Sequence, residues 1–224
     1  MLNNLRQSSA FLSDEGDAWF ERNKSMLSSE TSVEVDYISH ALLYFRNSIN
    51  SVLEIGCSNA VKLELLCKRF GASGFGIDPS ETAINAAKTR LGSCASPIQL
   101  DVGLGSILPY ESHSMDLVVF GFCLYVVDRE LLFRTLAEAD RVLRPEGFLA
   151  ITDFDPSHPH KKPYHHKAGL FSFKHDYPAL LTASGHYHLA QKMSYSHNEL
   201  SFSKEQKDRI ATSILFKEAC AYPD

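Results

Sequence analysis

Short apolar segments that indicate strands alternate with helical segments from residue 51 to residue 153. The predicted strands cover 51–55, 74–77, 97–102, 115–120 and 147–153, and the predicted helices cover 60–70, 80–91 and 128–143. Gly71 and Gly92 follow the first two helices, as expected of C-terminal caps. Ser80 and Asp128 stand where N-caps belong. Because this alternation produces βαβ units, it predicts an α/β fold with a mainly parallel sheet and helices on both faces.

The C-terminal third has a different order of elements. Residues 177–185 are predicted to be a helix that ends in a turn, and 189–195 and 209–217 to be two strands joined by a polar turn. Two consecutive strands without a helix between them pair antiparallel. The whole pattern therefore predicts a Rossmann-like, mainly parallel seven-stranded sheet that ends in a C-terminal antiparallel β-hairpin.

Composition argues against a nucleic-acid-binding, a disulfide-rich and a membrane-spanning protein. The chain has 224 residues and a net charge of −5. A protein that binds long nucleic acid usually has a basic surface, so this charge argues against nucleic-acid binding. It holds five cysteines at irregular spacing and without a CxxC pair, which argues against a disulfide framework and a thiolate metal site. We see no apolar run of the ~20 residues that span a bilayer and no secretory h-region, so we expect a cytoplasmic protein that does not bind membranes.

A strand that stops in a loop of small residues is the most specific motif. The stretch VLEIGCSNA places Gly56 after a short apolar strand and before a helix, where backbone N–H groups face a ligand. Glu54, inside that strand, would repel a phosphate and attract an ammonium group. We expect Cys57 to be a small filler in the turn rather than a nucleophile.

Acidic residues recur at the ends of the predicted strands. Asp78 ends the second strand, Asp101 ends the third, and Asp116 begins the fourth, which runs to Phe120 and Gly121. A carboxylate at Asp78 can accept both hydroxyls of a ribose, and Asp101 with the N–H of Val102 can contact an adenine. The alternative for each carboxylate is a turn or N-cap residue. Ligands bind at the carboxyl ends of strands in open α/β sheets, which favours one shared site.

These motifs together resemble the class I S-adenosylmethionine (SAM)-dependent methyltransferases. VLEIGCSNA is similar to the glycine-rich first motif of that superfamily, GIDPS to the second, QLDVG to the third, MDLVVFGFCLYVVDRE to the fourth, and RVLRPEGFLAITDF to the stretch that leads into the fifth strand. The loop has Ser58 and Ala60 where the family often has glycines. The resemblance implies that the cofactor is SAM, with S-adenosylhomocysteine (SAH) as product. It implies a cofactor site formed by Glu54, Gly56, Cys57, Ser58, Asn59, Asp78, Pro79, Asp101, Val102 and Phe120.

The chain is expected to have two parts. Residues 1–50 are predicted to be a helical N-terminal extension, and residues 51–224 a SAM-binding methyltransferase domain with a His/Lys-rich lid insertion at about 155–176. Eight of the ten histidines lie between residues 158 and 197. This insertion is either a polar surface loop, a lid that attracts an acidic substrate, or a metal site. Lysines 161, 162 and 167 would oppose a cation, so no metal is predicted.

The predicted function is methyl transfer to the oxygen or nitrogen of a small molecule, with an acidic, phosphorylated or sugar-type metabolite favoured. The candidates for catalysis are His158, His160, Asp153 and Tyr125. One alternative is a SAM-binding regulatory or scaffold protein. A second is an NAD-dependent oxidoreductase, which would carry a G-x-G-x-x-G that this chain lacks. We expect a small-molecule substrate as the partner, no nucleic acid, and a monomer or homodimer.

Overall fold

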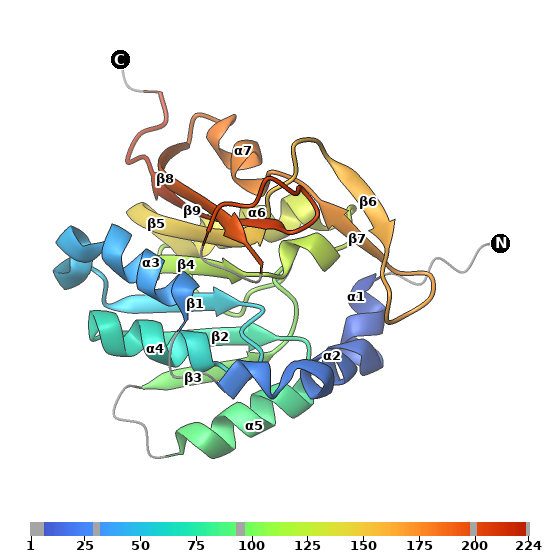
Figure 1. The fold of residues 1–224 in the computed structure, drawn as a ribbon. Coiled ribbons are helices and arrows are strands. Elements are labelled where there is room, and N and C mark those ends of the chain that lie inside the picture. Colours follow the sequence, from blue (N-terminus) through green and yellow to red (C-terminus); the bar gives the residue numbers. More distant parts are fainter. Residues whose placement is uncertain (1–6, 29–31, 93–96, 198–200, 223–224) are drawn as a thin grey trace.

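A seven-stranded sheet forms the centre of the computed structural model, which describes residues 7–28, 32–92, 97–197 and 201–222 (Figure 1). The strand order is β3-β2-β1-β4-β5-β9-β8. The strands are β1 (Ser51–Ile55), β2 (Ser73–Asp78), β3 (Ile98–Val102), β4 (Met115–Gly121), β5 (Leu143–Phe154), β8 (Tyr187–Ser196) and β9 (Arg209–Lys217). Strands β1 to β5 are parallel, whereas β9 pairs antiparallel with both β5 and β8. The predicted Rossmann-like sheet with a C-terminal antiparallel hairpin is confirmed.

Helices cover both faces of this sheet. They are α3 (Val33–Ala41), α4 (Val61–Phe70), α5 (Glu81–Leu91), α6 (Leu132–Val142) and α7 (Tyr177–Thr182). Alternating strand residues divide the core: Val52 packs with α3, α4 and α5, and Leu53 packs with α6 and α7. Burial on both faces explains why β1 and β4 are almost continuously apolar. No helix in the described part of the chain is long and apolar enough to cross a membrane.

The N-terminal ends of two helices test the cap predictions. Ser80 caps α5, because its Oγ accepts a hydrogen bond from Ala83 N at 3.0 Å. The expectation for Asp128 is wrong, since α6 begins four residues later, at Leu132. The Asp128 carboxylate instead accepts hydrogen bonds of 2.9 Å from the backbone N–H groups of Gln7 and Ser8. This acid therefore fixes a remote segment rather than the helix that follows it.

The described N-terminal segment runs past the carboxyl ends of the central strands (Figure 1). It contains α1 (Gln7–Ala10), a π-helical turn (Phe11–Glu15), α2 (Gly16–Asn23) and a 3-10 turn (Met26–Ser28), whereas a second 3-10 turn (Leu43–Ser48) precedes β1 at the opposite edge of the sheet. Beside α1 lies a separate hairpin of β6 (His160–Pro163) and β7 (Phe171–Lys174), within the predicted insertion. The hairpin contacts the segment through Phe171 N, which donates to Gln7 Oε1 at 2.8 Å.

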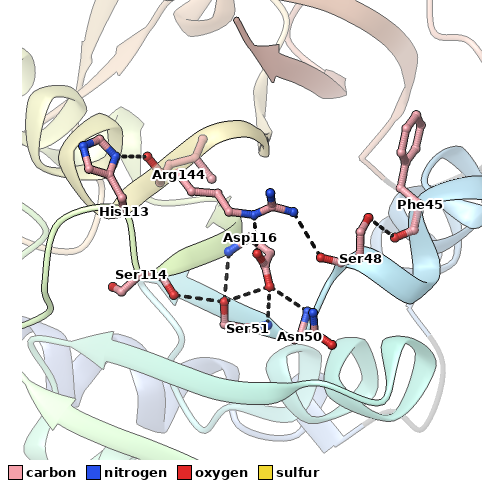
Figure 2. Close-up of polar contacts among 9 residues, drawn as sticks. Phe45, Ser48, Asn50, Ser51, His113, Ser114, Asp116 and Arg144 are labelled. Carbon is pink, nitrogen blue, oxygen red and sulfur yellow. Dashed lines mark hydrogen bonds and ion pairs between the residues drawn. The ribbon is translucent and has the colours of Figure 1, made fainter. Parts of the chain in front are cut away.

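Asp116 lies at the opposite, amino-terminal edge of the sheet (Figure 2). Its carboxylate accepts hydrogen bonds from the backbone N–H groups of Asn50 and Ser51, at 2.7 and 3.0 Å, and pairs with Arg144. Arg144 also donates to Ser48 O. This acid therefore connects the entry into β1 with β4 and β5, and it takes no part in a site at the carboxyl edge.

Candidate functional site

Three adjoining cavities form a cleft at the carboxyl ends of β1, β2 and β4, and Gly56 lines all three. The first, the Ser106 cavity, has a volume of about 90 Å³ and includes Gly103 to Ser106. The second, the Glu54 cavity, measures about 170 Å³. The third, the Asp78 cavity, measures about 80 Å³ and shares lining residues with both others. The N-terminal segment closes the cleft, because Phe11 and Trp19 contribute to its walls.

The loop after β1 holds its backbone in a conformation that most side chains avoid. Gly56 has φ +78°, and a Cβ at this position would lie 2.7 Å from Cys123 Cβ. Ser58 and Ala60 also have positive φ, at 48° and 56°. These are the two positions where related loops often have glycine, so the small side chains keep the same left-handed turns at some cost in strain. The loop therefore allows a ligand to approach the backbone.

Asp78 is oriented by backbone groups on both of its oxygens. Its Oδ2 accepts from Ser58 N at 2.8 Å, and its Oδ1 accepts from Ser80 N at 2.9 Å. Burial raises the pKa of this carboxyl to about 6, although these two N–H groups oppose the shift. Pro79 follows Asp78 and lines the same cavity. The second predicted motif is thus joined to the first by a direct hydrogen bond.

Glu54 is buried at the inner end of the cleft, and its Oε2 has no hydrogen-bond partner among the described residues. Burial raises its pKa to about 8, while Lys62 lowers it and Glu34 raises it further. An added Cβ on Gly121 would lie 2.9 Å from Glu54 Oε1, 3.6 Å from Glu34 Oε1 and 3.8 Å from Lys62 Nζ. Three ionisable side chains therefore converge where a side chain at Gly121 would stand.

Sequence reasoning missed Glu34 and Lys62. Lys62 is paired with Glu34 of α3, and although burial lowers the pKa of Lys62, Glu34 and Glu54 outweigh it and raise that pKa. Glu34 Oε1, like Glu54 Oε2, finds no partner among the described residues. Neither residue belongs to a motif, and only the packing of α3 against α4 brings them together.

Three further residues of the loop after β1 were predicted to contact the cofactor: Cys57, Ser58 and Asn59. Ser58 Oγ is buried without a described partner, and Asn59 Nδ2 donates to Leu27 O at 3.4 Å. Cys57 Sγ packs toward Gly76, where an added Cβ would lie 2.8 Å from it. Burial raises the pKa of the Cys57 thiol well above its usual value, so a thiolate is disfavoured.

Three predicted cofactor residues lie outside the cleft lining. The Asp101 carboxylate accepts from Tyr110 Oη at 3.1 Å and Gln99 Nε2 at 3.0 Å, and Val102 is exposed. The loop that directly follows, from Gly103, lines the Ser106 cavity. The Phe120 ring is fully buried in the core, so its side chain cannot run along a ligand. Gly121 and Phe122 line the cleft at the end of β4 instead.

Of the four candidates for catalysis, only Tyr125 lines the cleft. Asp153 is buried, accepts backbone hydrogen bonds from Tyr125 and Phe154, and has its pKa raised by burial to about 7. It lines a separate cavity of about 10 Å³. His158 is exposed, and its carbonyl lies 3.0 Å from His160 Nδ1. The structure does not bring these two histidines to the cleft, because β6 directs the insertion toward α1.

No side chain of the β6–β7 hairpin is among those that line the three cavities. The hairpin instead supports the N-terminal segment: Tyr164 Oη donates to Glu15 Oε1 at 3.0 Å, and Lys167 pairs with Asp14. Within the described ranges, no group of three or more His, Cys, Asp and Glu side chains is arranged to hold a metal ion.

Phe122 belongs to the fourth motif, but its position at the cleft was not predicted. It lines two cavities with φ +61°, a strained value for a bulky residue. Its ring stacks on His197, with centroids 5.3 Å apart and planes within 8°. Tyr125 and Phe154 contact it edge-on, at 5.7 and 5.0 Å. These contacts fix an aromatic ring at the wall of the cleft.

Comparisons with known proteins agree with this geometry. Residues 52–147 match the family model described as a methyltransferase domain. A relative named Methyltransferase GfsG, from Streptomyces halstedii, is 30% identical over 117 residues, which is 50% of this chain and 41% of that protein. The chain thus spans about two fifths of the length of the curated relatives it matches.

Solved structures share the fold over most of the chain. The 1,6-didemethyltoxoflavin-N1-methyltransferase of Burkholderia thailandensis, solved with 1,6-didemethyltoxoflavin and SAH, has a TM-score of 0.73 at 14% identity and covers 94% of this chain and 88% of its own. A SAM-dependent methyltransferase from Methanosarcina mazei has a TM-score of 0.63 at 18% identity, and the match covers 79% of this chain and 97% of that protein. Residues 52–147 thus match a methyltransferase domain, and the chain shares the fold of these methyltransferases.

Proposed function

We propose that the chain binds SAM in this cleft and transfers its methyl group to a small-molecule acceptor. The observation that carries the proposal is the buried Glu54 side chain, which lines the Glu54 cavity and whose Oε2 has no described partner. A buried carboxyl without a partner is costly, and a ligand ammonium would satisfy it. The amino-acid end of SAM carries such a group.

The rest of the cleft fits the other parts of this cofactor. Asp78 is held with both oxygens fixed near the Asp78 cavity, where a ribose can donate to them. The Ser106 cavity, at the end of β3, suits a flat base. Gly56 lines all three cavities and Gly121 lines two, so a ligand in the cleft meets backbone rather than side chains at these positions. One sequence relative and two structural neighbours with methyltransferase names support the same assignment.

When bound, SAM supplies an activated methyl group on a sulfonium. In the transfer, the S–CH3 bond breaks with its electrons going to sulfur, and a lone pair of the acceptor oxygen or nitrogen forms the new bond to carbon. The acceptor then loses its proton to water or to a base. The protein's own contribution is alignment and exclusion of water by the N-terminal segment.

A screen for SAH release tests this proposal. Purified protein is incubated with SAM and a panel of phenols, amines, carboxylates and sugar phosphates, and SAH is quantified. Turnover above the rate without acceptor supports methyl transfer. Calorimetry with SAH and with NAD separates the alternatives: SAH binding without turnover of any acceptor favours the scaffold, and NAD binding without SAH binding favours the oxidoreductase.

A further inference from the structure

We propose that the methyl acceptor is a flat, uncharged aromatic molecule that stacks in the cleft against Phe122 and Trp19. This inference rests on the proposed function, since it concerns the second ligand of the same cleft. It differs from the acidic, phosphorylated or sugar-type acceptor that the sequence favours.

The shape of the cleft wall supports a flat ligand. Trp19 of α2 and Phe122 of the loop after β4 come from distant parts of the chain, and both line the Glu54 and Asp78 cavities. Phe122 is held by three other rings, which compensates for its strained backbone. Strain of this kind persists where the surrounding structure fixes it and clusters at ligand sites. Two positioned rings present broad apolar surface to a planar ligand.

Tyr125 adds the polar group that such an acceptor needs. It lines the Asp78 cavity, and Trp19 makes a hydrogen bond with it that lowers its pKa, although burial raises that pKa overall. The hydroxyl therefore remains protonated at neutral pH. It can orient a phenol or ring nitrogen without placing a charge beside the ligand.

The charges in the cleft favour an uncharged acceptor over an anionic one. Among the described residues that line the three cavities, Lys62 carries the only basic side chain, and it is paired with Glu34. A phosphate would also meet the carboxylate of Asp78, and that of Glu54 once a ligand ammonium has displaced its proton. Burial of an unpaired charge beside like charges is strongly unfavourable. Lys161 and Lys162 of the hairpin do not line these cavities, so they add no positive charge to the lining.

The single tryptophan of the chain is Trp19, so its fluorescence reports on this wall alone. Protein saturated with SAH is titrated with 2,7-dihydroxynaphthalene and, separately, with glucose 6-phosphate. Free tryptophan amide serves to correct for absorbed light. We expect saturable quenching by the naphthalene and none by the sugar phosphate.

Two variants sharpen the test. Phe122→Leu should weaken naphthalene binding to the SAH-saturated protein about tenfold, and its circular dichroism spectrum verifies that the variant folds. Phe133→Leu, a matched change at an exposed ring on α6, should alter neither. Absence of saturable quenching, or tighter binding of glucose 6-phosphate, would overturn the aromatic acceptor while leaving SAM binding intact. Failure of SAH itself to bind would instead reject the proposed function.

Discussion

The backbone N–H of Ser58 donates a hydrogen bond of 2.8 Å to Asp78 Oδ2, and this contact joins the loop after β1 to the end of β2. Ser80 N holds the other oxygen at 2.9 Å. Because both donors belong to backbone, the carboxylate stands in one orientation before any ligand arrives. Such preorganisation lowers the entropy cost of binding.

Glu54 should make SAH affinity depend on pH. Its pKa near 8 means that it holds a proton in the ligand-free protein at pH 7. An ammonium favours the carboxylate and lowers this pKa, so binding releases a proton. Affinity should therefore rise between about pH 6 and pH 8, by up to about tenfold per pH unit, and level off above pH 8.

Calorimetry in two buffers of different ionisation enthalpy measures that proton release. Glu54→Gln should bind SAH with an affinity that hardly changes over this pH range. An equally steep rise in the variant would assign the proton to another group.

Asp116 should contribute stability but not binding. Its carboxylate accepts backbone hydrogen bonds at the amino edge of the sheet and pairs with Arg144 (Figure 2). Asp116→Ala should lower the free energy of unfolding by about 2 kcal/mol, the loss typical of hydrogen bonds to a charged group. Urea unfolding measures it, and an unchanged midpoint would contradict the structural role.

Tyr164 should control how firmly the N-terminal segment closes the cleft. Tyr164→Phe removes the hydrogen bond from its hydroxyl to the buried Glu15. A loss of about 1 kcal/mol corresponds to SAH dissociation about fivefold faster. Stopped-flow fluorescence of Trp19 follows this rate. Dissociation at the wild-type rate would show that SAH leaves without movement of the hairpin contact.

The cationic hairpin should not take part in ligand recognition. The double variant Lys161→Ala, Lys162→Ala is expected to leave SAH affinity within about twofold at low and high salt, because neither residue lines the cleft. The variant His158→Ala, His160→Ala should behave in the same way. A salt-dependent loss in the lysine variant would restore an electrostatic role for the hairpin.

The parts of the fold with strong local patterns were predictable, and the parts made by packing were not. The alternation from residue 51 and the paired strands at the C-terminus define the sheet, because apolar periodicity is local. Gly56, Asp78 and Glu54 follow from their places at strand ends. The pairing of β6 with β7 and their position beside α1 were not predictable, since no local pattern indicates them. Lys62 meets Glu34 only through helix packing, and Phe122 owes its ring contacts to residues far along the chain.

Calorimetric titration of SAH into the wild-type protein, Asp78→Asn and Asp116→Asn tests the SAM site most directly. Asp78→Asn keeps the shape but removes the charge that receives the ribose, so SAH affinity should fall about 10- to 100-fold. Asp116→Asn, a matched change at the opposite edge of the sheet, should bind as the wild type does. Equal affinity of the wild type and Asp78→Asn, or no binding of SAH to either, would contradict the assignment of this cleft to SAM.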